Sequence, residues 1–81
     1  MGFYVYMVRC SDGSFYTGHT DNLEWRLAAH NAGEIPGYTQ TRRPVHLAFC
    51  EELPTRLDAL ERERQLKGWS KAKKEALSRG D

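Results

Sequence analysis

The stretch Phe3–Thr20, FYVYMVRC-SDGS-FYTGHT, decides the fold of this chain. Two short runs rich in aromatic and β-branched residues flank the dipeptide Asp12-Gly13, which favours a tight turn between antiparallel strands. Each run carries a tyrosine, Tyr6 in the first and Tyr16 in the second. The stretch therefore predicts a β-hairpin that carries two phenols.

The length of the turn decides whether the two tyrosines share a face of the sheet, because side chains alternate along each strand. A two-residue loop would place Tyr6 and Tyr16 on opposite faces. A three-residue loop, with Gly13 in a left-handed bulge, would pair Cys10 with Ser14 and place both phenols on one face. A site that uses both tyrosines requires this second arrangement.

Both faces of the first strand are apolar or aromatic, which predicts a strand in the middle of a sheet that is covered on both sides. In the second strand, Gly18 follows Tyr16 by two residues. A side chain at that position would crowd whatever group approaches the end of the strand. The pattern indicates a close approach at Gly18.

Composition is that of one ordinary globular domain. The 81 residues are 40% hydrophobic and 28% charged. No apolar run approaches the roughly 20 residues that cross a bilayer, and the N-terminus lacks the layout of a secretory signal. We therefore expect a single domain over residues 1–81, a cytoplasmic location and no membrane partner. Cys10 and Cys50 are expected to be small buried residues in a reducing environment rather than a disulfide.

Capping signals and periodicity place the remaining elements. Asp21 as N-cap, with Glu24 three residues later, predicts a helix that ends at Gly33. A loop over residues 34–44 and a strand over residues 45–50 follow. Thr55 and Ser70 are predicted to cap two further helices, the second running to about residue 78. The resulting order is strand-strand-helix-strand-helix-helix, an α+β arrangement.

Three polar residues fall on helix faces that should point inward. Arg26 and His30 lie one turn apart in the apolar stripe of the first helix, and Glu63 lies in the apolar stripe of the second. The alternatives are a snorkelling arginine paired with a carboxylate, and a hydrogen-bonded core histidine. A carboxylate inside an apolar stripe is costly unless it is paired or holds a cation.

The formal net charge of +1 hides a basic cluster over residues 62–74, in which Glu63 is the only acid. Such a cluster attracts phosphates, although a solvated helix face is the more frequent explanation. The loop over residues 34–44 is predicted either to be a solvated surface loop or to supply further substrate contacts, namely from Tyr38, Thr39, Thr41, Arg42 and Arg43. The predicted nucleic-acid-binding residues are Arg42, Arg43, Lys67, Lys71, Lys73 and Lys74.

The residues predicted to point inward suit phosphodiester hydrolysis; they are Tyr6, Tyr16, Arg26, His30 and Glu63. An arginine together with a cation held by Glu63 can clamp a phosphodiester and neutralise charge that develops on its oxygens. A nearby phenol can relay a proton from attacking water. A single inward carboxylate predicts one ion, and Mg²⁺ (or Mn²⁺) fits a site whose other positions are filled by water and phosphate.

At these residues the chain resembles a stand-alone GIY-YIG nuclease domain of the small bacterial single-domain type, over nearly its whole length. The two signature elements appear as Tyr4-Val5-Tyr6 and Tyr16-Thr17-Gly18, ten residues from tyrosine to tyrosine. A further ten residues leads to Arg26. The surrounding patterns are Asn22-Leu23-x-x-Arg26-Leu27-x-x-His30-Asn31 and Ala59-Leu60-x-x-Glu63-x-x-x-Lys67. The chain departs from the family pattern at Tyr4, where the family has glycine, and at His19, where many members have lysine or an apolar residue.

The resemblance implies a three-stranded antiparallel sheet flanked by helices, and metal-dependent hydrolysis of DNA, with RNA not excluded. It assigns Tyr6 and Tyr16 as site phenols, with Tyr16 favoured as proton acceptor. Arg26 would bind the scissile phosphate, Glu63 would hold the metal, and His30 would assist orientation or proton relay. Two other interpretations stay open: a non-catalytic nucleic-acid-binding module, and an accessory subunit whose specificity comes from a protein partner.

Overall fold

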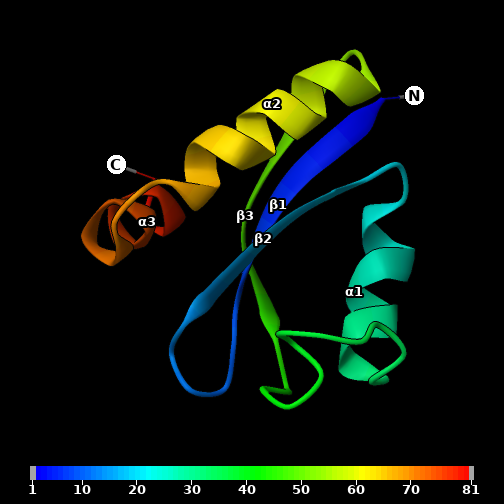
Figure 1. Cartoon of the computed structure of the whole chain (residues 1–81), viewed down its shortest axis with the longest axis vertical. Coiled ribbons are helices and arrows are strands. Elements are labelled where there is room, and N and C mark those ends of the chain that lie inside the picture. Colours follow the sequence, from blue (N-terminus) through cyan, green and yellow to red (C-terminus); the bar gives the residue numbers. More distant parts are fainter. Residues whose placement is uncertain (1, 81) are drawn as a thin grey trace.

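The computed structural model describes residues 2–80 and has a three-stranded antiparallel sheet in the order β2-β1-β3, with three helices (Figure 1). The strands are β1 (Phe3–Arg9), β2 (Phe15–Thr20) and β3 (His46–Leu53). The helices are α1 (Leu23–Asn31), α2 (Arg56–Lys67) and α3 (Lys71–Ser78). The predicted α+β class and element order are confirmed.

β1 is the central strand, as its two apolar faces predict. Val5, Tyr6, Met7 and Val8 are all buried. The face that carries Tyr6 packs toward α1, because the Tyr6 hydroxyl contacts His30 of that helix. Helix α2 packs against both β1 and β2. The sheet is therefore covered on both sides where the two tyrosines lie.

The hairpin turn is the three-residue form. The backbone N–H of Cys10 donates to the carbonyl of Ser14 at 2.8 Å, and the N–H of Gly13 donates to the carbonyl of Cys10 at 2.9 Å. Gly13 has a φ of 85°, a left-handed conformation that glycine adopts without strain. The turn therefore sets the register that a shared tyrosine site requires.

The register places both tyrosines on one face of the sheet. Tyr6 lies opposite Gly18, and Val8 lies opposite Tyr16. Tyr6 and Val8 are two residues apart on one strand, so their side chains share a face. Tyr16 lies directly opposite Val8 and therefore points to the same face as Tyr6. His19 lies between Gly18 and Thr20 and points to the opposite face of β2.

The N-cap of α1 is Asn22, so the prediction of Asp21 is wrong by one residue. The Asn22 Oδ1 atom accepts from the N–H of Trp25 at 3.1 Å. β2 continues to Thr20, whose hydroxyl accepts from the N–H of Asn22 at 3.1 Å. This bond fixes Asn22 at the capping position, and Asp21 remains exposed. The predicted caps Thr55 and Ser70 are confirmed.

β3 runs from His46 to Leu53, so the predicted strand over residues 45–50 ends too early. Glu51 and Glu52 pair with β1 despite their charge, because β3 is an edge strand with one side open to water. Glu51 there accepts from the guanidinium of Arg62 at 2.9 Å. Cys50, on the same edge, is exposed and not buried as expected, whereas Cys10 is buried; both thiols are free.

The segment between α1 and β3 has no strand or helix but is fixed at both ends. The side chain of Asn31 brackets Val45, donating to its carbonyl at 3.0 Å and accepting from its N–H at 2.7 Å. The carbonyl of Arg42 accepts from the N–H of Ser11 at 2.9 Å. The loop therefore packs against both α1 and the hairpin turn.

Within residues 2–80, no helix combines the length and apolar character needed to cross a membrane.

Candidate active site

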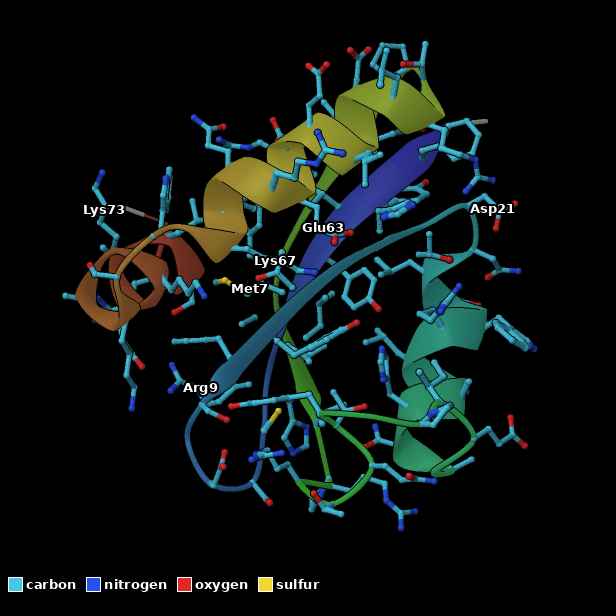
Figure 2. The ribbon with its side chains drawn as sticks, in the orientation of Figure 1. Met7, Arg9, Asp21, Glu63, Lys67 and Lys73 are labelled. Carbon is cyan, nitrogen blue, oxygen red and sulfur yellow. The ribbon has the colours of Figure 1, made fainter. Side chains whose placement is uncertain are left out.

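A polar cavity of about 350 Å³ is lined by residues of β1, β2, α1 and α2. Four of the five residues predicted as catalytic line it: Tyr6 and Tyr16 from the sheet, Arg26 from α1 and Glu63 from α2. Figure 2 shows Glu63 and Lys67 extending from α2 toward β2. The structure thus brings residues spread over most of the chain to one place.

Tyr6 forms the buried floor of this site. Its side chain is 1% exposed, and its hydroxyl lies 2.8 Å from the Nε2 atom of His30. Burial raises the pKa of Tyr6 far above its ordinary value; Tyr16 and Glu63 raise it further, against the opposing effect of Arg26. Tyr6 therefore keeps its proton at neutral pH.

Gly18 makes room for the Tyr6 hydroxyl. A Cβ atom at position 18 would lie 2.7 Å from that oxygen, closer than two such atoms can approach. The phenol crosses the neighbouring strand at the one place without a side chain. This is the close approach that the position of Gly18 indicates.

His30 lies behind the two tyrosines rather than on the cavity wall. It is 1% exposed, and its ring makes edge contacts with those of Tyr6 and Tyr16, at centroid distances of 5.8 and 5.4 Å. Burial lowers the pKa of His30, and the charge of Arg26 lowers it further. The imidazole is therefore neutral at pH 7 and can accept a hydrogen bond on one nitrogen while donating on the other.

Thr39 is the second partner of this imidazole. Its hydroxyl lies 2.7 Å from the Nδ1 atom of His30, and the residue is 2% exposed. The expectation that Thr39 contacts substrate from a surface loop is therefore wrong, because the loop folds back and buries it. Thr39, His30 and Tyr6 form one continuous hydrogen-bonded chain.

Tyr16 is held by a stack of side chains from the loop. Its ring lies 6.1 Å from that of Tyr38 at an interplanar angle of 21°. The guanidinium of Arg42 covers the other ring at 3.9 Å. Arg42 also donates to the carboxylate of Asp12 at 3.1 Å and to the carbonyl of Tyr38 at 2.8 Å. Arg42 thus contributes to the packing that positions Tyr16.

Arg26 is half-buried and extends into the cavity. Its Nε atom is buried and has no hydrogen-bond partner among residues 2–80. Buried donors in native structures are nearly always satisfied, and an unpaired one at a cavity wall marks a place where an acceptor fits. A phosphate oxygen has the charge and the geometry to be that acceptor.

Glu63 is 9% exposed and both of its oxygens are engaged. Oε1 lies 2.5 Å from Nδ1 of His19, and Oε2 lies 2.8 Å from Nζ of Lys67. Burial raises the pKa of Glu63, but the hydrogen bonds from Lys67 and His19 outweigh it, and the pKa is below its ordinary value. The carboxylate is ionised at neutral pH.

Two basic cavity residues, His19 and Arg56, are given no role by the sequence. His19 faces α2 because it alternates with Gly18, and an inward Glu63 with no assigned partner was the only signal for it. Arg56 also lines the cavity, and its guanidinium lies 4.7 Å from the ring of Phe3. Arg56 is exposed at the first position of α2, and the sequence pattern contains no signal that it reaches the cavity.

Glu63 is the residue of the cavity that is suited to bind a divalent ion. No group of three or more His, Cys, Asp or Glu side chains suited to a metal occurs within residues 2–80. Glu63 offers a buried, ionised carboxylate on the wall of a polar cavity. A single oxygen ligand is enough for Mg²⁺, which keeps several waters and takes substrate phosphate as a further ligand.

Most of the predicted nucleic-acid-binding residues lie apart from the cavity. Lys67 is paired with Glu63, while Arg43 donates to the carbonyl of Gln40 at 2.9 Å. Lys73 lies 5.0 Å from the ring of Trp69, and Figure 2 places it well away from Glu63. None of the six lines the cavity: Arg42, Arg43, Lys67, Lys71, Lys73 and Lys74.

Known proteins resemble this chain over most of its length. The sequence model of the GIY-YIG catalytic domain matches residues 2–76. A UPF0213 protein of Staphylococcus haemolyticus is 48% identical over 88% of this chain and 87% of its own length. A UPF0213 protein of Halobacterium salinarum is 45% identical over 91% of this chain and 96% of its own length.

Two solved structures share the fold. The NMR structure of a UPF0213 protein from Bacillus halodurans has a TM-score of 0.59 and 38% identity, covering 95% of this chain and 82% of that one. The NMR structure of an E. faecalis protein has a TM-score of 0.65 and 34% identity, covering 99% and 85%. With the family match over nearly the whole sequence, these likenesses show that the chain belongs to the GIY-YIG catalytic domain family.

Proposed function

We propose that this protein is a divalent-metal-dependent endonuclease that hydrolyses DNA phosphodiester bonds. Membership of the GIY-YIG family implies a nuclease-type function and a nucleic-acid substrate. The substrates that we propose are DNA forms recognised by shape, such as branched, nicked or single-stranded DNA of repair or recombination. RNA is the alternative substrate, and the cleavage panel includes it.

The observation that carries the proposal is the unpaired Nε of Arg26 in a cavity that also holds two phenols and an ionised carboxylate. An arginine clamps a phosphate, a phenol relays a proton, and a carboxylate holds a cation, so each group answers one requirement of phosphodiester hydrolysis. Buried donors that serve only stability are nearly always paired, so the unpaired Nε of Arg26 supports a role in binding an acceptor.

Glu63 would hold Mg²⁺ or Mn²⁺, which when bound neutralises phosphate charge and lowers the pKa of water. Arg26 would bind a non-bridging oxygen of the scissile phosphate. Tyr16 is the phenol favoured to take the proton of the attacking water, because Tyr6 is buried and hydrogen-bonded to His30. His30 would hold the Tyr6 hydroxyl in place and so position the cavity floor.

A cleavage panel tests this proposal. Duplex, flap, fork, single-stranded DNA and RNA would be incubated with Mg²⁺ or Mn²⁺ and the wild-type protein or Glu63→Ala. Glu61→Ala is the matched control, because Glu61 lies on the same helix and is exposed to solvent. We expect metal-dependent cutting by the wild type and the control, and none by Glu63→Ala. Equal cutting by all three proteins would refute the role of Glu63.

One observation favours a second candidate, a nucleic-acid-binding module without catalysis. Both oxygens of Glu63 already contact cationic or hydrogen-bonding partners, Lys67 and His19, so the site is satisfied without a metal. In that case the basic residues would bind phosphates, and an accessory role with a protein partner would follow. Metal-independent DNA binding by the wild type, with no cleavage of any panel substrate, would support this candidate.

A further inference from the structure

His19 and Glu63 place two potential metal-ligand atoms side by side on the cavity wall. Nδ1 of the imidazole lies 2.5 Å from Oε1 of the carboxylate. Imidazole nitrogen and carboxylate oxygen are both donors to first-row divalent ions. The pair belongs to rigid elements, since His19 lies within β2 and Glu63 within α2.

The orientation of the carboxylate leaves one oxygen for this pair. Lys67 holds Oε2 at 2.8 Å from the same helix, one turn further along. Outer contacts of this kind fix the direction in which a ligand presents its free atom. Oε1 is therefore turned toward His19, and the side chain of His19 is only partly exposed.

The spacing is close to that of two ligands on one ion. Two donors each about 2.1 Å from an ion, at a right angle to one another, are about 3 Å apart. An ion would take the place of the proton between Nδ1 and Oε1. His19 would then carry its ring proton on Nε2, turn the Nδ1 lone pair toward the ion, and move about 0.5 Å further from Glu63. Both side chains line the same cavity, so an ion between them would face the place where Arg26 and Tyr16 converge.

We propose that His19 is a second protein ligand of the ion held by Glu63, which makes this a mixed nitrogen–oxygen site. The inference rests on the proposed function and adds a preference to it. Mg²⁺ favours oxygen ligands, whereas an imidazole ligand suits Mn²⁺ and later transition ions. The site therefore selects Mn²⁺ over Mg²⁺, and His19 is the residue that makes the selection.

The test measures metal binding directly on the full chain. Mn²⁺ is titrated into ¹⁵N-labelled protein at pH 7.5, and the paramagnetic broadening of backbone signals near β2 and α2 gives its affinity. Mg²⁺ competition then gives the affinity for the second ion. The variants are His19→Gln and Glu63→Gln, with His46→Gln as a matched control because His46 is exposed on β3. Circular dichroism and urea unfolding show that each variant is folded.

We expect His19→Gln to weaken Mn²⁺ binding about tenfold or more while changing Mg²⁺ binding by less than about twofold. Glu63→Gln should weaken both ions, and His46→Gln neither. Unchanged Mn²⁺ binding in His19→Gln, with loss in Glu63→Gln, would overturn the role of His19 and leave the Glu63 site standing. Unchanged binding in both variants, or no binding by the wild type, would overturn the metal site of the proposed function as well.

Discussion

The two faces of the sheet hold their site residues by different means. On the face toward α1, Tyr6, His30 and Thr39 form a buried chain of neutral hydrogen bonds. On the face toward α2, His19 and Lys67 contact the ionised carboxylate of Glu63 at the edge of the cavity. The first arrangement is fixed by core packing, whereas the second is held by charge.

This difference separates what is preformed from what is exchangeable. Removing one partner from a buried neutral network lowers the free energy of unfolding, because the remaining group is left without a hydrogen bond. Partners of a carboxylate at a cavity wall can be replaced by another cation or by water. The α1 side therefore positions groups, and the α2 side is suited to receive a ligand.

Arg26 is an exception on the α1 side, and its substitution should have the largest effect on cleavage. It lies on the α1 side, yet its buried Nε has no partner within residues 2–80. Arg26→Ala should lower single-turnover cleavage by about 10²–10³, the usual loss when a donor to a developing negative charge is removed. Its free energy of unfolding should change little. Cleavage at the wild-type rate would contradict the phosphate clamp, and Arg26→Gln tests the need for charge.

Gly18→Ala tests how tightly the preformed side is packed. The added Cβ would lie 2.7 Å from the Tyr6 hydroxyl and force the phenol away from His30. Overpacking of this kind costs about 1–3 kcal/mol. Urea unfolding should show that loss, and the NMR signals of the His30 ring should shift. Gly37→Ala is the control for space, because no atom lies within 4 Å of its added Cβ. Alanine at position 37 also adds backbone strain, because the φ of Gly37 is 113°. The two variants are therefore distinguished by the NMR signals of the His30 ring, which should shift only in Gly18→Ala.

Thr39→Val probes the far end of the neutral chain. Valine keeps the shape of threonine but removes the hydroxyl that lies 2.7 Å from Nδ1 of His30. A buried nitrogen left without a partner costs about 1–3 kcal/mol. We expect a loss in that range by urea unfolding, and about none for Thr41→Val, which changes an exposed residue of the same loop. Equal stabilities of the two variants would show that the bond contributes nothing.

The pH dependence of stability distinguishes the neutral side from the charged one. The pKa of His30 is lowered in the folded state by burial and by Arg26, with the phenols of Tyr6 and Tyr16 also facing the ring. The unfolded chain therefore binds more protons, and stability falls as pH falls below the unfolded value of about 6.5. The lowered pKa of Glu63 acts only below about pH 4.5.

Between pH 6.5 and pH 5, the wild type should therefore lose stability more steeply than His30→Gln, measured as the midpoint of thermal unfolding. His46→Gln, at an exposed position, should follow the wild-type slope. Parallel curves for wild type and His30→Gln would contradict a neutral, buried His30.

The smallest effect is expected from the lysines of α3, which lie outside both sides of the comparison. Changing Lys71, Lys73 and Lys74 to alanine should weaken DNA binding and reduce its salt dependence by about one unit of slope per lost phosphate contact. None of the three lines the cavity, so the cleavage rate at saturating DNA should stay unchanged. A fall in that rate would place α3 in the reaction itself.

The sequence alone determined the elements and much of what points inward. Alternation in Phe3–Arg9 predicts a central strand, the position of Gly18 indicates a close approach, and Thr55 and Ser70 are caps, because each depends on interactions within a few residues. The three-residue turn was one of two open alternatives, and Gly13 with a left-handed φ decided it. Local signals failed by one residue at Asp21, where Thr20 binds the backbone of Asn22.

Only the tertiary structure decided the partners. Thr39 and His30 are nine residues apart and Tyr6 is further still, yet they share one buried chain. His19 meets Glu63 because β2 and α2 pack together, a contact between residues 44 apart that no spacing rule contains. Hydrogen bonds and ion pairs at such separations depend on how the helices pack on the sheet. Periodicity can say that a side chain points inward, but packing alone sets what it meets there.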